Sequence, residues 1–348
     1  MKRYLTIGNR GGWTVKSCCM GLLSLLLCMA PVCFFTSCSS IDEDMSDCGV
    51  EYEMEYELQL TTDIETALHT QLTSEKELQV ADALRNYLDN IFSGVAHDID
   101  LSFYGTGKDA TLLHQENHQM NDSNKTYTIF LPENEYRNIA LANINDNQGI
   151  TKEGTNQSST LTLQQEQSDI VPSQTAAIYT GCVDMDVKEG DQQKYHVDLY
   201  MVNSVTALVI DNALGVEVKD IQVYATGFAT GFNVNDSTYT FVDNPPLVQA
   251  QSVDTGLDDM LCFCTVNFPS RDKAEGDEPL WQYVVYVTLA DGSVTKSVLT
   301  VKEPLGAGDL KVVTAHLQPD GSLQPDSALV GVSITLEWKQ GGTYEPEM

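Results

Sequence analysis

The residue types that could support catalysis or metal binding occur in this chain without the spacings that such chemistry needs. His114 and His118 stand four residues apart with Glu116 between them, whereas the zinc-protease motif has a glutamate directly after the first histidine. Residues 105–109, Gly-Thr-Gly-Lys-Asp, end in an aspartate where a phosphate-binding loop needs serine or threonine. We therefore expect no enzyme, no cofactor and no metal site, and we interpret residues 114–118 as a solvated loop.

The charge of the chain excludes one class of partner. Its 50 acidic and 19 basic residues give a formal net charge of −31. Such a chain repels nucleic acid, and we expect no nucleic-acid partner. With so many acids, a pair of carboxylates is not diagnostic of glycoside hydrolysis.

Cysteine is the residue type whose positions carry most information. Four of the nine cysteines lie in the apolar segment near the N-terminus: Cys18, Cys19, Cys28 and Cys33. Beyond Cys38, four remain, and they allow three pairings: Cys48, Cys182, Cys262 and Cys264. Cys262 and Cys264 are two residues apart in an extended pattern, so they share a face and do not suit a bond with each other. Disulfides, a zinc site and buried free thiols stay open as alternatives, although the Cys-x-x-Cys pair typical of zinc sites is missing.

Cys38 stands at the end of a secretory address. Basic residues precede an apolar run over residues 18–35, and small residues follow it, which is the pattern of a signal peptide. Phe35-Thr36-Ser37-Cys38 resembles a bacterial lipobox, which implies cleavage after residue 37 and acylation of Cys38. A retained membrane helix is the alternative, but Pro31 and the acids after Cys38 argue against it.

The tether behind Cys38 indicates a location. Residues 38–47 are acidic, and Ser39-Ser40-Ile41-Asp42-Glu43-Asp44 resembles the export signal of surface lipoproteins in Bacteroidetes. This resemblance implies a protein held by lipid on the cell outer membrane and facing the surface.

The elements after the tether are mostly strands. Residues 50–60 alternate apolar and polar side chains, which predicts a half-buried strand. Ser74 and Glu77 form a capping box, and apolar residues then recur at helical spacing until Gly94, so a helix is predicted over 74–94. From residue 99 onward, short strand patterns alternate with turn residues. They include a long extended run over residues 195–210, a hairpin at Asp291-Gly292 and a strand over residues 331–338.

These patterns predict a mainly β fold of two β-sandwich domains, the first with one α-helix. A turn-like segment, Lys188-Glu189-Gly190-Asp191, marks the expected boundary. We therefore divide the chain into a signal peptide (1–37), a tether (38–47) and two domains (48–190 and 191–348). The doubled Ala-Thr-Gly-Phe of residues 225–232 fits either a bulged strand or a binding loop.

The order of several motifs resembles one family. Asp44-Met45-Ser46-Asp47-Cys48-Gly49, placed between the lipobox and the first strand, is similar to the start of FimB-type fimbrial anchor proteins of Bacteroidales. Ile178-Tyr179-Thr180-Gly181 and Val205-Thr206-Ala207-Leu208-Val209 are similar to that family's passage between its domains. The resemblance implies two transthyretin-like sandwiches, a place at the base of a surface fimbrium, a role in cell adhesion, and a stalk subunit as partner held by strand exchange.

One feature of the sequence separates an anchor from a stalk subunit. In such fimbriae, stalk subunits lose their first strand to an arginine- or lysine-specific protease, and a neighbour's strand replaces it. From Cys38 to Glu75 this chain has no lysine or arginine. We infer that the strand over 50–60 and the lipid both stay in place.

Two alternatives to the anchor role stay open. A surface glycan-binding lipoprotein needs exposed aromatic side chains, for which Trp281 and Trp338 are candidates. A tip or stalk subunit needs a cleavable site before Lys76. Asp236-Ser237-Thr238 and Asp326-Ser327-Ala328 resemble the O-glycosylation signal of Bacteroidetes, which implies modification at Ser237 and Ser327.

Overall fold

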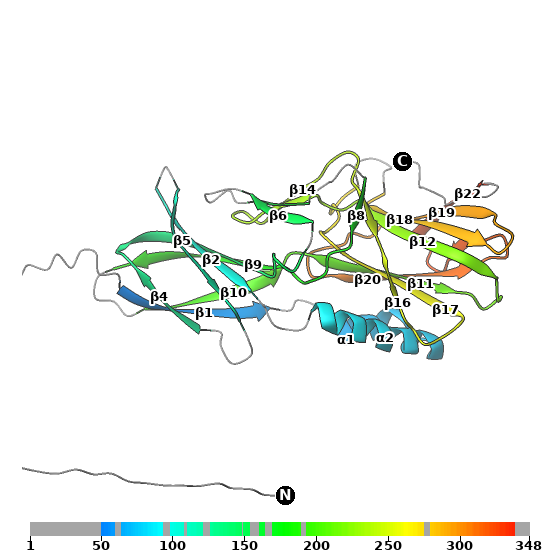
Figure 1. The fold of residues 1–348 in the computed structure, drawn as a ribbon, viewed down its shortest axis with the longest axis horizontal. Coiled ribbons are helices and arrows are strands. Elements are labelled where there is room, and N and C mark those ends of the chain that lie inside the picture. Colours follow the sequence, from blue (N-terminus) through cyan, green and yellow to red (C-terminus); the bar gives the residue numbers. More distant parts are fainter. Residues whose placement is uncertain are drawn as a thin grey trace, which may run out of the picture. The chain divides into compact units, whose positions relative to one another are not determined.

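The computed structural model describes residues 50–59, 64–92, 98–107, 110–120, 126–147, 149–153, 160–163, 169–188, 193–274 and 279–337. Within these ranges the chain forms four sheets and two helices (Figure 1). The expectation of a mainly β, sandwich-forming chain is confirmed.

The first sheet has seven strands, all from residues 50–201. Its order is β3-β2-β5-β9-β10-β1-β4. The bounds are β1 (Val50–Gln59), β2 (Ile99–Gly105), β3 (Leu112–His118), β4 (Thr126–Leu131), β5 (Asn134–Ala142), β9 (Tyr179–Val187) and β10 (Lys194–Met201). Neighbours run antiparallel except β1 and β10, which are parallel.

The alternation of β1 confirms the predicted strand and places its apolar residues in the core. Tyr52, Met54 and Tyr56 are fully buried. The Tyr56 hydroxyl donates to Oδ1 of Asn138 on β5, although β9 and β10 lie between β1 and β5 in the sheet order. The sheet therefore curls so that side chains from strands that are not neighbours meet on its inner face.

The predicted helix is present, and a second helix precedes it. α2 (Glu75–Ile91) begins at the capping box of Ser74 and Glu77. α1 (Ile64–Gln71) was not predicted. The two helices connect β1 to β2, and their buried residues recur at helical spacing: Leu68, Leu72, Val80, Ala81, Leu84 and Leu88.

The second half forms a sandwich of two sheets. The five-stranded sheet has the order β16 (Gln251–Val253), β17 (Met260–Asn267), β11 (Ser204–Asp211), β20 (Leu310–Leu317) and β21 (Leu323–Pro325). The six-stranded sheet has the order β22 (Val330–Glu337), β19 (Val294–Val301), β18 (Trp281–Leu289), β12 (Val218–Thr226), β15 (Leu247–Gln249) and β8 (Ile170–Pro172). The predicted hairpin at Asp291-Gly292 joins β18 to β19, with Gly292 at φ +85°.

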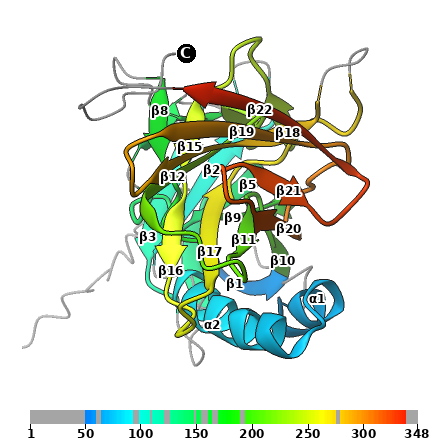
Figure 2. The same cartoon turned by 90° about the vertical axis from the view of Figure 1, so that its right-hand side faces the viewer.

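The helices cover the face of the five-stranded sheet that the sandwich leaves open. Ala207 and Val209 of β11 pack in one core with Leu84 and Leu88 of α2. Leu208 and Ile210, on the other face of β11, pack with side chains of the six-stranded sheet. Figure 2 shows both helices beside β17 and β20. The result is three layers, with the five-stranded sheet in the middle.

A small fourth sheet lies on the back of the first. Its order is β14 (Thr238–Thr240), β13 (Gly231–Asn233), β7 (Thr160–Leu163) and β6 (Ile150–Glu153). Phe232 and Leu161 pack there with Ile139 and Leu141 of β5. β5 is therefore buried on both faces.

The long extended run predicted from residue 195 to 210 is two strands in different sheets. β10 ends at Met201, and β11 begins at Ser204. The buried Asn203 holds this junction, because its amide donates to the carbonyl of Ala176 and to Oε1 of Gln174. The domain boundary expected near residue 190 stays a prediction, since a change of sheet is not itself a domain boundary.

The doubled Ala-Thr-Gly-Phe connects two sheets. The first copy ends β12, and the second enters β13. Gly227 has φ +101°, and a Cβ there would lie 2.6 Å from the Cα of Trp281, so only glycine fits. Phe228 and Phe232 are buried in separate cores, which does not suit an exposed binding loop.

Candidate functional site

β1 lies inside its sheet rather than at an edge. It pairs with β10 from Glu53 to Gln59 and with β4 from Val50 to Glu55. Withdrawing β1 would expose an unpaired edge on each neighbour, which is unfavourable in water and prone to pairing with another chain.

The buried face of β1 adds side-chain anchors to this backbone pairing. The Tyr52 hydroxyl donates to the carbonyl of Lys188 at 2.9 Å, and that of Tyr56 to Asn138 at 3.1 Å. Burial raises the pKa of Tyr56 well above its usual value, so the phenol stays neutral. Burying a large apolar side chain is worth about 1.5–3 kcal/mol, so three such residues resist extraction of the strand.

Lys76, the first basic residue after Cys38, has an exposed side chain but lies in a regular helix. It stands in the first turn of α2, where its ammonium group pairs with the carboxylate of Asp259. The hydrogen bond to Asp259 raises the pKa of Lys76. The Ser74 hydroxyl accepts the N–H of Glu77, and the Glu77 carboxylate accepts the N–H of Ser74. Proteolysis concentrates at exposed loop tips, so a capped helix is a poor substrate.

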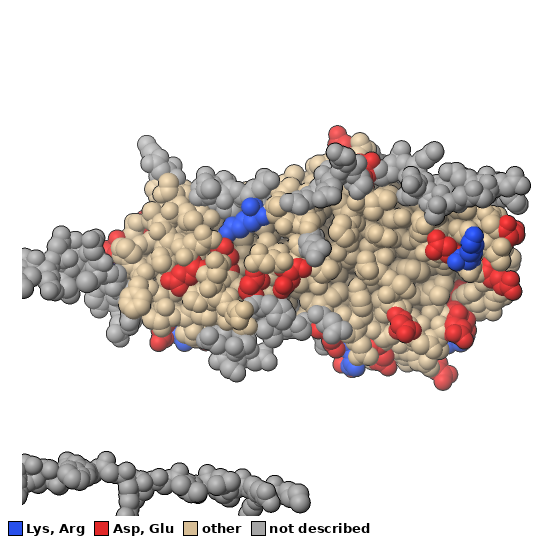
Figure 3. Space-filling model, viewed as in Figure 1, with Lys and Arg blue, Asp and Glu red and all other residues tan. Residues whose placement is uncertain are grey.

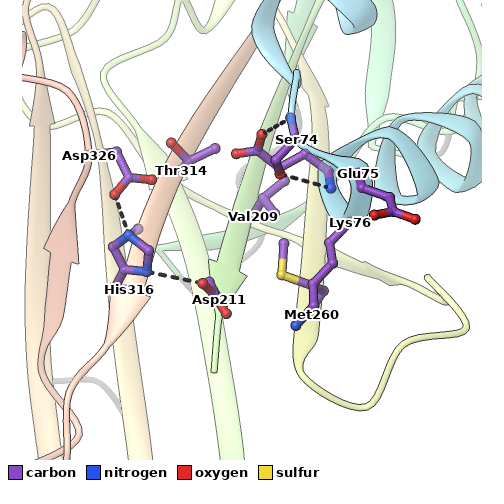
Figure 4. A pocket seen from close by; sticks show the side chains of 11 residues that line it. Ser74, Glu75, Lys76, Val209, Asp211, Met260, Thr314, His316 and Asp326 are labelled. Atoms are coloured by element: carbon purple, nitrogen blue, oxygen red, sulfur yellow. Dashed lines mark hydrogen bonds and ion pairs between the residues drawn. The ribbon is translucent and has the colours of Figure 1, made fainter. Parts of the chain in front are cut away.

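A cavity of about 390 Å³ opens beside the N-terminus of α2, between that helix and the ends of β11 and β20. Figure 4 shows His316 between two carboxylates: its Nδ1 lies 3.2 Å from Asp211, and its Nε2 lies 2.7 Å from Asp326. Both ring nitrogens are engaged with acids, and Ser74 serves the helix cap. The lining residues therefore form ion pairs rather than the nucleophile–base pair of covalent catalysis.

β22 is the edge strand of the six-stranded sheet, and among the described strands its one neighbour is β19. Val332 and Ile334 are 43% and 46% exposed. They lie opposite the buried Leu299 and Ser297, and therefore on the face of the sheet that points toward the core. Their exposure shows that the opposite layer of the sandwich does not reach this edge strand. An exposed apolar edge of this kind is a template for pairing with another chain.

The strand over residues 331–338 was predicted, but its exposure was not. The available signal was the alternation of Val330, Val332, Ile334 and Leu336 close to the end of the chain. Alternation alone does not reveal which side of a strand lacks a covering layer.

The site residues expected from the sequence are distributed as follows. Cys38 lies outside the described residues. Ser237 is exposed in the turn between β13 and β14, with φ +56°. Ser327 is exposed between β21 and β22, where its hydroxyl accepts the N–H of Leu329. The two serines occupy separate turns, so the structure does not bring them into one site.

The interpretation of residues 114–118 as a solvated loop is wrong. They lie in β3, and His114, Glu116 and His118 are register partners of the buried Phe103, Leu101 and Ile99. The Glu116 carboxylate lies 2.7 Å from each imidazole, one at each oxygen. The segment was missed because its strand alternation is carried by polar side chains.

Most of the tryptophan and cysteine side chains that the sequence offered as site candidates and that the structure describes lie in the core. Trp281 is 1% exposed and donates its indole N–H to the carbonyl of Glu303, and Trp338 lies outside the described residues. Cys262 and Cys264 are buried free thiols on one face of β17, and Cys182 is an exposed free thiol. Cys48 lies outside the described residues, so its pairing stays open.

The surface charge agrees with the composition. On the face drawn in Figure 3, acidic side chains are spread over the sheets and basic ones are sparse. Neither described helix is long and apolar enough to cross a membrane.

Comparison with known families gives one match that spans more than half of the chain. The family model described as fimbrillin-A associated anchor proteins Mfa1 and Mfa2 matches residues 62–259. No curated protein matches the chain.

Comparison with solved structures identifies similar folds. A protein described as an adhesin from Bacteroides ovatus has a TM-score of 0.51 at 10% identity, covering 81% of this chain and 95% of its own. A second such protein from Bacteroides ovatus has a TM-score of 0.50 at 9% identity, covering 84% and 97%. The fimbrial anchor protein Mfa2 from Porphyromonas gingivalis has a TM-score of 0.45 at 11% identity, covering 83% and 99%.

Proposed function

The chain belongs to the family of fimbrillin-A associated anchor proteins, and we propose that it is the lipid-anchored subunit at the base of a surface fimbrium. Family membership makes it a fimbrial anchor or adhesin-like protein, associated with fimbrial subunits rather than with a known enzymatic reaction. The proposal adds an acylated Cys38, a retained first strand and a strand given to the stalk.

Attachment through Cys38 rests on the sequence before it. The basic start, the apolar run and the small residues at the cut site are those of a bacterial lipoprotein signal. Stable anchoring requires more than one acyl chain, and a multiply acylated cysteine meets this requirement. The acidic residues after Cys38 support export to the outer face of the cell outer membrane.

The position of β1 is the observation that carries the proposal. A subunit that accepts a neighbour's strand must first open a groove in its own sheet. Here β1 fills that position with pairing on both sides and three fully buried side chains. The nearest basic residue downstream is Lys76, in the capped helix α2. The protein therefore suits a terminal role in which it gives a strand and accepts none.

β22 is the strand that we assign to the exchange with the stalk. It is the last of the described strands. To leave its sheet it would have to break one ladder among the described strands, the one with β19. Val330, Val332 and Ile334 alternate along it, so they can enter successive pockets of a groove while the backbone completes a sheet. Each buried aliphatic side chain would contribute about 1.5–3 kcal/mol.

The main alternative has less support, because the two aromatic side chains of the described residues that are largely exposed, Phe130 (55%) and Tyr200 (47%), lie on separate strands, β4 and β10. A glycan-binding surface normally uses exposed aromatic rings, and Trp281 is buried. The exposed Ser237 and Ser327 are accessible to a glycosylating enzyme, and we keep them as proposed modification sites.

The N-terminus of the protein on intact cells tests the anchor role. We expect mass spectrometry to find an acylated Cys38 followed by residues 39–75 without a break. A mature chain that begins beyond Lys76 would show that β1 is removed, and the protein would then be a stalk or tip subunit.

Substitutions on β22 test strand exchange. Val332→Asp and Ile334→Asp place charges on the apolar face, so we expect shed fibres and loss of co-purification with the stalk subunit. Ser333→Asp is the matched control, because the same charge then lies on the opposite face of the strand. Equal fibre attachment in all three variants would exclude β22 as the exchanged strand.

A further inference from the structure

The outer face of β1 and β10 carries a group of ligating side chains. In the parallel register, Glu55 lies opposite His196, and Glu57 lies opposite Asp198. These four residues project from the face opposite Tyr56 and Val197, because side chains alternate along a strand. Two neighbouring strands therefore present three carboxylates around one imidazole.

The distances bring three of these side chains to one point. Nε2 of His196 lies 3.1 Å from Oδ1 of Asp198 and 3.5 Å from Oε2 of Glu57. One ligand atom from each of these residues lies within 4.8 Å of the other two. The side chains are between one third and three fifths exposed, so an ion has direct access.

Glu55 occupies the place of a supporting residue. Its carboxylate lies 3.7 Å from Nδ1 of His196 and 3.0 Å from the ammonium group of Lys194. Metal-binding histidines commonly donate their second ring N–H to a carboxylate, which fixes the ring and raises its basicity. Glu55 lies on the Nδ1 side of the ring, so Nε2 is the nitrogen that faces Glu57 and Asp198.

We propose that Glu57, His196 and Asp198 bind a divalent transition-metal ion, with Zn²⁺ as the best match. Imidazole favours zinc and its neighbours in the periodic table, and carboxylates complete such ligand sets. Three protein ligands with water in the remaining position are usual for an accessible zinc site. The alternative is a simple ion pair, in which a protonated His196 offsets the two acids.

Charge balance favours the ion. Glu57 and Asp198 are register partners, and like charges directly opposite each other destabilise a sheet. Lys194 is engaged with Glu55 and is not paired with these two acids in the structure. A divalent cation removes the repulsion and joins the two strands through their side chains.

A bound ion would help to hold β1, the strand that the proposed anchor retains, in its sheet. Glu57 belongs to β1, whereas His196 and Asp198 belong to β10, so the ion would clamp β1 to the sheet. The metal site stands on this geometry alone and does not depend on the proposed function.

Zinc titration of the full chain, purified in detergent without a histidine tag, tests the site. We expect calorimetry to show one bound Zn²⁺ that His196→Ala and Asp198→Asn each weaken by at least about tenfold, since even supporting residues of metal sites have effects of this size. Hydrogen exchange of β1 and β10 should slow when zinc is added to the wild type and stay unchanged in His196→Ala.

His316→Ala is the matched control. His316 also lies between two carboxylates, but they contact opposite ring nitrogens and do not converge on one ion. This variant should bind zinc as the wild type does. The proposal is overturned if the wild type binds no zinc at millimolar concentration, or if the His196 and Asp198 variants bind it unchanged.

Discussion

His114, Glu116 and His118 show how single residues protect an exposed edge. β3 is an edge strand, and these side chains point from it toward the inner face of the sheet. Inward-pointing charges prevent an edge strand from pairing with another chain, because such pairing would bury them further. The stacked contact of His118 with Tyr127, at 4.4 Å, joins this edge to β4.

Glu116→Gln tests the energetic role of this cluster through pH. Burial acts to raise the pKa of Glu116, but the hydrogen bonds from His114 and His118 outweigh it and leave the pKa below 4.5. A depressed carboxyl pKa stabilises the fold above the unfolded-state pKa, and this stability is lost as pH falls through the folded-state pKa. The difference in unfolding free energy between wild type and variant should be full above the unfolded-state pKa of a glutamate, about 4.3, and shrink as pH falls below it.

Urea titrations across this pH range measure the difference. Glu133→Gln serves as the control, because Glu133 is exposed in the turn between β4 and β5. Its difference from the wild type should be small at every pH. A difference for Glu116→Gln that grows as pH falls would contradict the assigned role.

The cysteines should react according to their burial. Burial raises the pKa of Cys262 to about 12 and that of Cys264 well above its usual value, so neither forms the reactive thiolate near neutral pH. Cys182 is exposed. Iodoacetamide should label Cys182 in the folded protein and reach the two thiols of β17 only after unfolding. Peptide mass spectrometry reads the labels, and native labelling of Cys264 would show that the core of β17 is open.

At the scale of elements, sequence patterns predict what the chain itself enforces. The alternation of β1, the capping box of α2 and the Asp-Gly hairpin are local signals, and each is confirmed. α1 was missed because it is short and gains its stability by packing on β20. The split between β10 and β11 was missed because only Val202 and Asn203 separate the two extended patterns, and the turn is made by the buried Asn203.

For the candidate sites too, some features can be read from the sequence and others need the fold. The proposal that the first strand is retained rests on the missing lysine and arginine between Cys38 and Lys76, which the sequence alone reveals. The group of Glu57, His196 and Asp198 joins residues about 140 positions apart in the sequence through a parallel register. No local pattern predicts which strand of the second half lies beside β1.

Gln71 is the contact by which α1 holds the five-stranded sheet. Its amide nitrogen donates to the carbonyl of Leu310, and its amide oxygen accepts the N–H of Val312. Gln71→Ala leaves both backbone groups of β20 without this partner, so we expect a loss of about 1–3 kcal/mol in unfolding free energy. Gln79→Ala, at an exposed position of α2, should change it by no more than about 0.5 kcal/mol. Equal effects of the two substitutions in urea titrations would show that the Gln71 contact contributes nothing.

At the scale of the molecule, the helices link the two halves of the chain. They lie between β1 and β2 in the sequence, yet their buried faces pack with Ala207, Cys262 and Cys264 of the five-stranded sheet. The same core includes Tyr56 and Phe103 of the seven-stranded sheet. In the proposed anchor, a force on β1 would therefore be shared between the seven-stranded sheet, the two helices and the five-stranded sheet.

This shared core predicts that residues 50–337 unfold in one cooperative transition. Far-UV circular dichroism reports all sheets, and fluorescence of the buried Trp281 reports the six-stranded sheet, so the two signals should change together. Leu84→Ala removes a fully buried side chain between α2 and the sheets, and we expect it to cost about 2–5 kcal/mol and to shift both signals equally. Leu78→Ala is the control on the same helix, because Leu78 is 38% exposed and its truncation leaves a smaller cavity. Two separate transitions, of which Leu84→Ala moves only one, would instead show two independent domains and would support the boundary expected near residue 190.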